Sequence, residues 1–335
     1  MAALSRVAAT LSALTSRLDP RARSHSLSQT IMTHDATKLA DTIKILKAER
    51  NACVVAHYYQ SGDVCRLADF VGDSLDLARY ARKATTEVIV VAGVVFMAEM
   101  VKVMTPERMV LLANAEAKCE MADMISAEDV RGLRRKFPGI PIVAYINTSA
   151  AVKAEADICC TSKNAREIVQ RINGDEVVFV PDQNVADYVG QSTSKSILKF
   201  PGYCYVHKEM SAQTIAVQRE RHPAAKVLAH PECPREILDR ADVVESTGGM
   251  LAHVSRAVDH EYIVATEEGF VDELRRRFPQ KQFYSLNHVC GGMKKTSVHD
   301  IVNSLEKKRF QIELPEEIVQ RARKSMERMF ALSPA

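Results

Sequence analysis

The sequence of 335 residues contains no C-x-x-C pair, no Cys/His cluster of zinc-finger spacing and no secretory signal. These absences argue against a zinc finger and against a disulfide framework. The eight cysteines are therefore expected to be reduced thiols. If several of them bind a metal, the ligands must converge from distant parts of the chain.

A membrane-spanning run and a basic surface are also lacking. The longest apolar run, Val88 to Ala98, is well short of the ~20 residues that a membrane helix needs, and it is typical of a buried strand leading into a helix. The formal charge of +3 arises wholly within residues 1–31, so the rest of the chain is formally neutral. We expect neither a membrane nor a nucleic acid as partner.

Residues 1–31 are rich in Ala, Ser and Arg and poor in acids. This composition suits an organellar transit peptide. The alternatives are a disordered extension or translation that truly begins at Met32, and we favour these, which gives a cytoplasmic protein. The folded part is expected to begin near Asp35, because apolar residues have helical spacing over residues 38–50.

Three stretches of the sequence resemble one another. ADFVGDS at 68–74, ADICCTS at 156–162 and ADVVEST at 241–247 are each followed by a helix-like stretch and an apolar strand-like run. Each stretch is also preceded by an apolar run that ends in polar residues. Further along, each copy has another apolar run, which ends in a cysteine. Such an internal repeat indicates three units of one kind. The equivalent positions are His57, Tyr145 and His230, and then Cys119, Cys204 and Cys290.

Apolar runs that alternate with amphipathic helices predict parallel strands covered on both faces. The expected fold is α/β, with three small four-stranded parallel sheets, flanked by helices, around a pseudo-threefold axis and a central active site. Ligands in such sheets bind beyond the carboxyl ends of the strands. The expected units are 35–137, 138–222 and 223–296, with a helical tail, 297–335, that packs on the first unit.

The three equivalent cysteines suit an iron–sulfur cluster. Three thiolates can each bind one iron of a 4Fe-4S cluster and leave the fourth iron without a protein ligand. An open iron is a Lewis acid toward a carboxylate or hydroxyl oxygen. The alternative is that Cys119, Cys204 and Cys290 are ordinary core cysteines, which their matching positions disfavour.

Three hydroxyl residues, Ser74, Ser162 and Thr247, stand where a strand gives way to a helix. The simplest interpretation of any one of them is a helix N-cap. The same geometry also binds phosphate or carboxylate, and for three converging sites we favour anion binding by at least two.

Three pairs of polar residues, each spaced i, i+2, follow strand-like runs, which places both members on the same side of a strand. A carboxylate such as Glu232 is costly to bury there unless it has a function. A Tyr, a Glu and two His around an anion site suit general acid–base steps. The pairs are His57 and Tyr59, Tyr145 and Asn147, and His230 and Glu232.

Over residues 36–335 the chain resembles the quinolinate synthase family, the A protein of de novo NAD biosynthesis. The shared motifs, in the family's order, are AHYYQ, GDSL, VVFMAE, C-x-MADM, YIN, TSKNA, PDQN, GYCYVH, HPEC, STGGM and CGGMKK. The resemblance implies one 4Fe-4S cluster per chain, bound by Cys119, Cys204 and Cys290, with one iron free of protein ligands. Some relatives carry further cysteines around the third ligand, whereas here Gly291 and Gly292 follow it, so no thiol–disulfide switch is expected.

The resemblance also implies the reaction and its residues. Family members condense iminoaspartate (iminosuccinate) with dihydroxyacetone phosphate to quinolinate, releasing phosphate and two waters. An L-aspartate oxidase or an aspartate dehydrogenase is the implied upstream enzyme. The implied proton-transfer residues are His57, Tyr59 and Glu232. The implied substrate-binding residues are His57, Ser74, Tyr145, Ile146, Asn147, Ser162, His230, Pro231, Glu232 and Thr247.

Two rival functions remain at this point. One is a metal-free sugar-phosphate lyase that acts through a Schiff base on Lys153 or Lys294. The other is a non-catalytic iron–sulfur redox sensor that signals to a partner. The vicinal pair Cys159 and Cys160 falls in a strand-like run before Ser162, so we expect these two thiols to be structural.

Overall fold

The computed structural model describes residues 38–332. Residues 38–49 are helical, as the spacing of their apolar residues predicts. The expected start near Asp35 and the extension 1–31 lie outside the described residues. The chain divides after Ile45, and residues 46 onward form a compact unit of their own, which is described below. No helix in the described part of the chain is long and apolar enough to cross a membrane.

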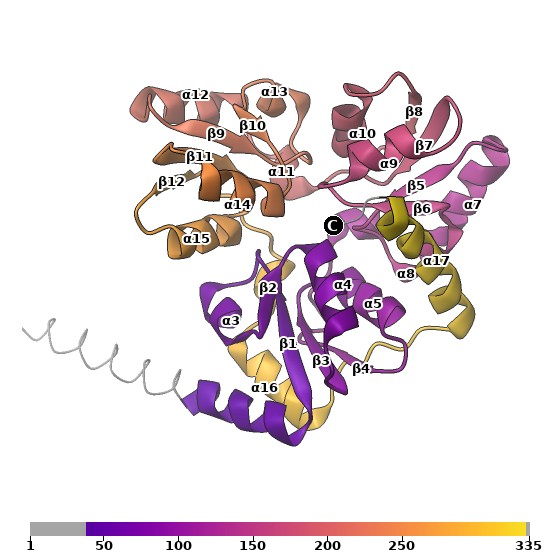
Figure 1. Ribbon diagram of the computed structural model, residues 1–335, viewed down its shortest axis with the longest axis vertical. Coiled ribbons are helices and arrows are strands. Elements are labelled where there is room, and N and C mark those ends of the chain that lie inside the picture. The colour runs from indigo at the N-terminus through magenta and orange to yellow at the C-terminus, as the bar shows by residue number, and fades with distance from the viewer. Residues whose placement is uncertain (1–37, 333–335) are drawn as a thin grey trace, which may run out of the picture. The chain divides into compact units, whose positions relative to one another are not determined.

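Three four-stranded sheets form this unit, and all of their strand pairs are parallel (Figure 1). Their orders are β2-β1-β3-β4, β6-β5-β7-β8 and β10-β9-β11-β12, the same arrangement three times. This confirms the predicted fold class.

The strands of the first sheet are β1 (Ala52–His57), β2 (Phe70–Gly72), β3 (Val88–Ala92) and β4 (Met109–Leu112). Those of the second are β5 (Ile142–Tyr145), β6 (Ile158–Cys160), β7 (Glu176–Val180) and β8 (Ser196–Lys199). Those of the third are β9 (Lys226–Ala229), β10 (Val243–Val244), β11 (Glu261–Ala265) and β12 (Gln282–Ser285).

Helices connect successive strands and cover the sheets, which explains why the central strands are apolar along their length. Those of the first unit are α3 (Gly62–Leu67), α4 (Ser74–Lys83), α5 (Val95–Met104), α6 (Glu120–Asp123) and α7 (Ala127–Lys136). Those of the second are α8 (Ala150–Glu155), α9 (Ala165–Arg171), α10 (Gln183–Gly190), α11 (Tyr205–Lys208) and α12 (Ala212–Arg221). The third has α13 (Arg235–Leu238), α14 (Thr247–Arg256) and α15 (Glu268–Arg277).

The register of the two central strands is also repeated. Ala56 pairs with Ala92 in the first sheet, Ala144 with Val180 in the second, and Ala229 with Ala265 in the third. The central strands of each sheet therefore end level with each other. The residues that follow them leave the sheet at its carboxyl edge, where ligands bind in folds of this kind.

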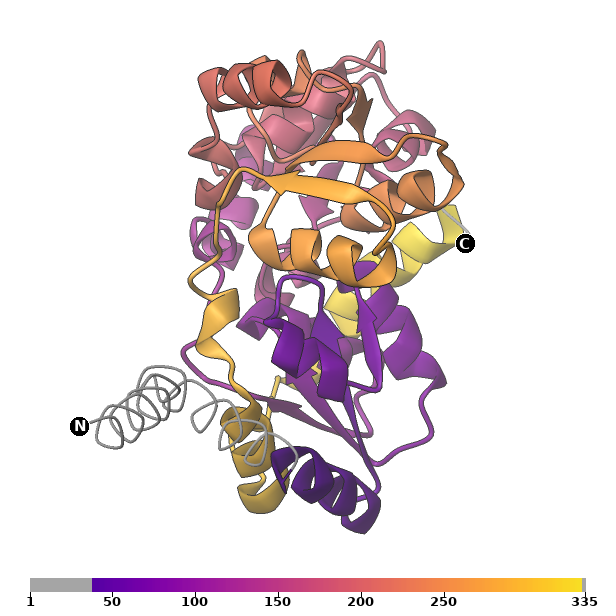
Figure 2. The same cartoon turned by 90° about the vertical axis from the view of Figure 1, so that its left-hand side faces the viewer.

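The C-terminal tail contacts both the first and the second unit, whereas we expected it to pack on the first. Helix α16 (Val298–Lys307) lies against β3, and residues 310–312 then pair with the edge strand β4, where the Ile312 N–H donates to the Val110 carbonyl at 2.8 Å. Helix α17 (Glu316–Leu332) packs mainly on α8 and β6 of the second unit and also contacts α5 of the first. The two views show α16 and α17 on separate parts of the unit (Figures 1 and 2).

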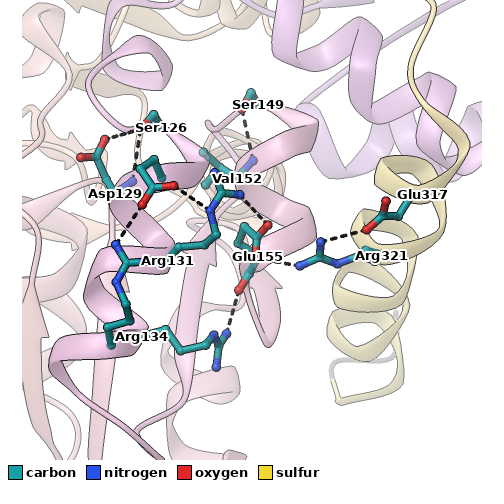
Figure 3. Close-up of polar contacts among 11 residues, drawn as sticks. Ser126, Asp129, Arg131, Arg134, Ser149, Val152, Glu155, Glu317 and Arg321 are labelled. Carbon is teal, nitrogen blue, oxygen red and sulfur yellow. Dashed lines mark hydrogen bonds and ion pairs between the residues drawn. The ribbon is translucent and has the colours of Figure 1, made fainter.

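Helix α17 is held by charge as well as by packing. Glu155, at the end of α8, pairs with Arg131 of α7 at 2.9 Å and with Arg321 of α17 at 2.7 Å (Figure 3). The buried Ser325 hydroxyl donates to the Lys153 carbonyl at 2.8 Å. The apolar face of α17 could have covered either sheet, and these polar contacts favour the second. The boundaries of the three predicted units stay a prediction.

Candidate active site

One pocket is lined by residues from all three sheets. It brings together all of the predicted thiols and nearly all of the predicted pocket residues. Pro231 is the exception: it is buried but does not line the pocket. It lies between two residues that project to the same side after β9, so its own side chain points elsewhere. The predicted residues that line the pocket are His57, Tyr59, Ser74, Cys119, Tyr145, Ile146, Asn147, Ser162, Cys204, His230, Glu232, Thr247 and Cys290.

His57 and His230 occupy the same local turn in the first and third units. The N–H of Tyr59 donates to His57 Nδ1 at 3.1 Å, and the N–H of Glu232 donates to His230 Nδ1 at 3.3 Å. Burial lowers the pKa of His57 to about 3 and that of His230 to about 4. Both rings are neutral near pH 7, and since Nδ1 accepts a hydrogen bond, each carries its proton on Nε2.

Glu232 is a buried carboxylate surrounded by polar side chains of the second unit. The Tyr145 hydroxyl donates to Oε1 at 2.6 Å, and Asn147 Nδ2 is 3.4 Å from the same oxygen. Burial by itself would raise the pKa of Glu232, but His230, His207 and the Tyr145 hydroxyl outweigh it and lower the pKa to about 2. Glu232 is therefore ionised at neutral pH and able to accept a proton.

His207 was missed by the sequence analysis. It is fully buried, and its Nδ1 lies 2.9 Å from Glu232 Oε2, although the ring N–H is not directed well enough for a hydrogen bond. On its other side, Nε2 is 3.0 Å from the Thr266 hydroxyl, which is 2.7 Å from the Tyr59 hydroxyl. A chain of polar contacts thus connects Tyr59 to Glu232. The GYCYVH motif contains His207, whereas nothing in the sequence distinguished Thr266.

The three predicted hydroxyls are not helix N-caps. The caps of α4 and α14 are Asp73 and Ser246, so Ser74 and Thr247 are the first helical residues, and Ser162 lies two residues before Asn164, which precedes α9. The N-cap interpretation was wrong because Asp73 and Ser246 accept the capping hydrogen bonds of α4 and α14, and Ser162 lies outside the cap position of α9. The side chains of Ser74, Ser162 and Thr247 are left to face the pocket. That of Ser162 lies 3.2 Å from His230 Nε2.

Asp73 also lines the pocket and was not predicted. Its carboxylate caps α4 by accepting the Asp76 N–H at 2.9 Å. Burial and the nearby Asp76 carboxylate raise the pKa of Asp73 to about 6. Its place in the GDSL motif, directly before Ser74, was the available indication.

The three predicted thiols have equivalent surroundings. Each is partly exposed and free, and each stands directly before or close to a short helix: Cys119 before α6, Cys204 before α11, and Cys290 before the 3-10 turn Met293–Lys295. Burial raises the pKa of all three, that of Cys119 to about 12. Thiolates here therefore need compensating positive charge. In each case a backbone N–H three residues further on, of Ala122, His207 or Met293, opposes the effect of burial.

The backbone before each thiol is held by one repeated hydrogen bond. The N–H of the first residue in the preceding long helix donates at 2.9 Å to the carbonyl two residues before the cysteine. The three loops are therefore fixed alike, as the register of the repeats predicts. The pairs are Val95 to Ala117, Gln183 to Gly202, and Glu268 to His288.

The donor set fits a cluster better than a single ion. Within residues 38–332 the one group of three ligand atoms lying within 4.8 Å of one another is that of Cys204, His207 and Glu232. The sulfurs of the three pocket cysteines are spread more widely than that, as ligands to different irons of a cluster are. Glu232 and His207 lie close to Cys204 alone among the three, and a set of three thiolates suits iron–sulfur chemistry.

The vicinal cysteines and the two lysines of the Schiff-base hypothesis lie outside the pocket. Cys159 and Cys160 are fully buried in β6, outside the pocket, and Cys159 Sγ is 3.3 Å from the Ser325 hydroxyl of α17. Lys153 is fully buried against Thr148, and Lys294 pairs with Glu267 at 2.9 Å. Neither lysine lines the pocket, so the Schiff-base hypothesis has no nucleophile there.

Residues 41–331 match the protein family described as Quinolinate synthetase A protein. The chain is 43% identical over 297 residues to quinolinate synthase 2 of Methanosarcina acetivorans, which covers 88% of this chain and 96% of the relative. It is 43% identical over 300 residues to quinolinate synthase of Pyrococcus horikoshii, covering 88% and 99%. It is 44% identical over 293 residues to quinolinate synthase of Dehalococcoides mccartyi, covering 87% and 97%.

Replacing Thr266 by Val should destabilise the protein, because it leaves the Tyr59 hydroxyl and His207 Nε2 without their shared partner. The expected loss is about 1–3 kcal/mol of unfolding free energy, the usual cost of an unsatisfied buried polar group. Urea unfolding followed by circular dichroism measures it. Thr266→Ser keeps the hydroxyl and is the matched control, and an equal loss in both variants would contradict the role given to this hydroxyl.

Proposed function

Since the chain belongs to the Quinolinate synthetase A protein family, we propose that it is a quinolinate synthase that condenses iminoaspartate (iminosuccinate) with dihydroxyacetone phosphate. The products are quinolinate, phosphate and two waters. The observation that supports this proposal is the single pocket into which all three sheets bring thiols, neutral imidazoles, a carboxylate and hydroxyls. A redox sensor would not need such acid–base groups beside its thiols.

Cys119, Cys204 and Cys290 are the proposed ligands of one 4Fe-4S cluster per chain, with one iron free of protein ligands. Their equivalent places before short helices, and their common pocket, support this set. When bound, such a cluster supplies a Lewis acid toward a carboxylate or hydroxyl oxygen. The positive ends of the short helices favour the thiolate form of ligands at their N-termini.

The substrates' anionic groups are proposed to bind at the starts of helices. The hydroxyls of Ser74 and Thr247 stand at the first residues of α4 and α14 and face the pocket. Helix N-termini offer free N–H groups and a positive dipole to phosphate or carboxylate. Ser162 and Asn147, from the second unit, add a hydroxyl and an amide to the same pocket.

Proton transfer is proposed to involve Glu232, Tyr59 and His57. Glu232 is ionised and can take a proton, while burial raises the pKa of Tyr59 well above its ordinary value and keeps its phenol neutral. Neutral His57 has its proton on Nε2, from which it can donate to a substrate oxygen. Groups whose pKa values are pushed apart in this way supply both an acid and a base at one pH.

Thr266 and His207 are proposed to couple the protonation state of Tyr59 to that of Glu232. The hydroxyl of Thr266 can both donate and accept, so it can follow a change in the protonation of either neighbour. An L-aspartate oxidase or an aspartate dehydrogenase remains the proposed source of iminoaspartate, and a cytoplasmic location stays a prediction.

The function is tested by a strictly anaerobic assay of phosphate release. Purified chain with a reconstituted cluster should release phosphate from dihydroxyacetone phosphate only when iminoaspartate is present, and quinolinate should form in equal amount. Absence of any iminoaspartate-dependent release from protein with full iron content would favour the redox-sensor alternative.

Glu232→Gln should leave the cluster intact and reduce kcat by about 10²- to 10⁴-fold, the usual contribution of a general acid or base. Gln keeps the size of the side chain and its hydrogen bond from Tyr145 but cannot take the proton. Iron content and the visible spectrum monitor the cluster, and the quinolinate assay measures turnover. Glu236→Gln, at an exposed position in α13, is the matched control. Full activity in Glu232→Gln would contradict the assigned role.

Replacing both Cys159 and Cys160 by Ala should leave the iron content per chain unchanged, because neither thiol reaches the pocket. Replacing Cys204 by Ala should remove one of the proposed ligands and lower the iron content sharply. Iron and sulfide analysis after anaerobic reconstitution compares the variants. Loss of iron in the double variant, with retention in Cys204→Ala, would reverse the assignment.

A further inference from the structure

The loop that carries Cys290 contacts both of the other cysteine loops. The N–H of Gly291 donates to the hydroxyl of Tyr205, the residue after Cys204, at 2.8 Å. Gly292 packs so closely on the residue before Cys119 that a Cβ there would lie 2.0 Å from the Lys118 carbonyl oxygen. The position of this third loop therefore determines how the three thiols lie relative to one another.

The third loop is itself held by a buried carboxylate. Glu267, the N-cap of α15, is fully buried, and its Oε1 accepts the N–H of Cys290 at 3.1 Å. Its Oε2 accepts the N–H of Gly269 at 2.6 Å, which fixes the carboxylate to the start of α15. Both oxygens are thus used, one to cap the helix and one to hold the thiol's own backbone.

Lys294 balances the charge of Glu267 and extends the connection to the first unit. Its Nζ lies 2.9 Å from Glu267 Oε1 and donates to the Tyr59 carbonyl at 2.5 Å. The backbone N–H of Lys294 donates to the Cys290 carbonyl at 3.1 Å, closing the turn. One lysine therefore joins the third thiol's loop to the tyrosine that is proposed to transfer protons.

The corresponding residues of the other two units do not form such a pair. The N-cap of α5 is Val94, which has no polar side chain, and the N-cap of α10 is Asp182, whose buried Oδ2 lacks a hydrogen-bond partner. The Glu267–Lys294 pair is therefore a departure from the threefold repeat, at a loop that contacts both of the others.

We propose that Glu267 and Lys294 are positioning residues, which fix the Cys290 thiol against the other two thiols and against Tyr59. The inference rests on the proposed function, in which Cys290 is a ligand of the cluster. Glu267 is fully buried, so removing Lys294 leaves a buried charge uncompensated, whereas removing both members of the pair is far milder. The two residues should therefore be strongly coupled in their effect on cluster retention.

The experiment uses the full chain, reconstituted anaerobically, as Lys294→Met, Glu267→Gln and the double variant. Each single variant should lose iron to EDTA about tenfold faster than the unaltered protein, and the double variant more slowly than either single one, as expected for coupled charges. The reduction potential of the cluster should shift in the single variants, since it depends on hydrogen bonding and charge around the ligands. Both measurements are independent of turnover.

Lys295→Met is the matched control. Lys295 is the next residue of the same loop, its side chain is more than half exposed, and its nearest acidic partner, Glu116, is 3.8 Å away. This variant makes the same change in charge and should lose iron at the rate of the unaltered protein. Single variants that match Lys295→Met, or a double variant whose effect is the product of the single ones, would overturn the inference.

Results that contradict the proposed function differ from results that contradict only the positioning role of Glu267 and Lys294. If the unaltered chain binds no iron, or if Cys290→Ala retains full iron, the ligand assignment is wrong and the inference falls with it. If both single variants fail to fold, the inference is tested by comparing the double variant with Lys295→Met. It should bind the cluster and lose it faster than Lys295→Met does, and an equal rate would overturn the inference.

Discussion

A chain of polar contacts beside the pocket joins the three units, and the rest of the site depends on it. It runs from Tyr59 after β1, through Thr266 after β11 and His207 of α11, to Glu232 and then Tyr145. Buried polar groups are tolerated only when they are paired, and a lone ionised carboxylate at Glu232 would be very costly. Each unit contributes partners at the same place, and these contacts help to hold the three carboxyl edges together.

The three units repeat one backbone arrangement, but the side chains at equivalent positions around the pocket differ in their chemistry. The strand order, the central register and the hydrogen bond before each cysteine recur in all three units. The side chains that follow the central strands differ: His57, Tyr145 and His230 in one position, and Val94, Asp182 and Glu267 at the helix N-caps. A symmetric scaffold is enough to place three like thiols around one cluster. Distinct acids and bases are needed for two different substrates.

The sequence was sufficient to predict the fold class and the common pocket that the three cysteines line, because these follow from backbone periodicity and equal spacing. It was not sufficient where a choice between neighbouring side chains decided the outcome. Asp73 and Ser246 cap their helices in place of Ser74 and Thr247, since short polar residues compete for the same N–H groups. His207 and Thr266 join the chain of polar contacts through residues far away in the sequence. The face that α17 covers was likewise undetermined, because an amphipathic helix can bury its apolar side against either sheet.

The charge of the pocket determines what the proposed cofactor has to supply. Both proposed substrates are anions, yet none of the described residues that line the pocket is a lysine or an arginine. The ionised Glu232 repels such ligands, and His57 and His230 are neutral because burial lowers their pKa values. The attraction must then come from the N–H groups at the starts of α4 and α14 and from the group that the thiols hold. Loss of that group would remove the open iron that can coordinate a carboxylate or hydroxyl oxygen, so substrate binding should depend on cluster binding.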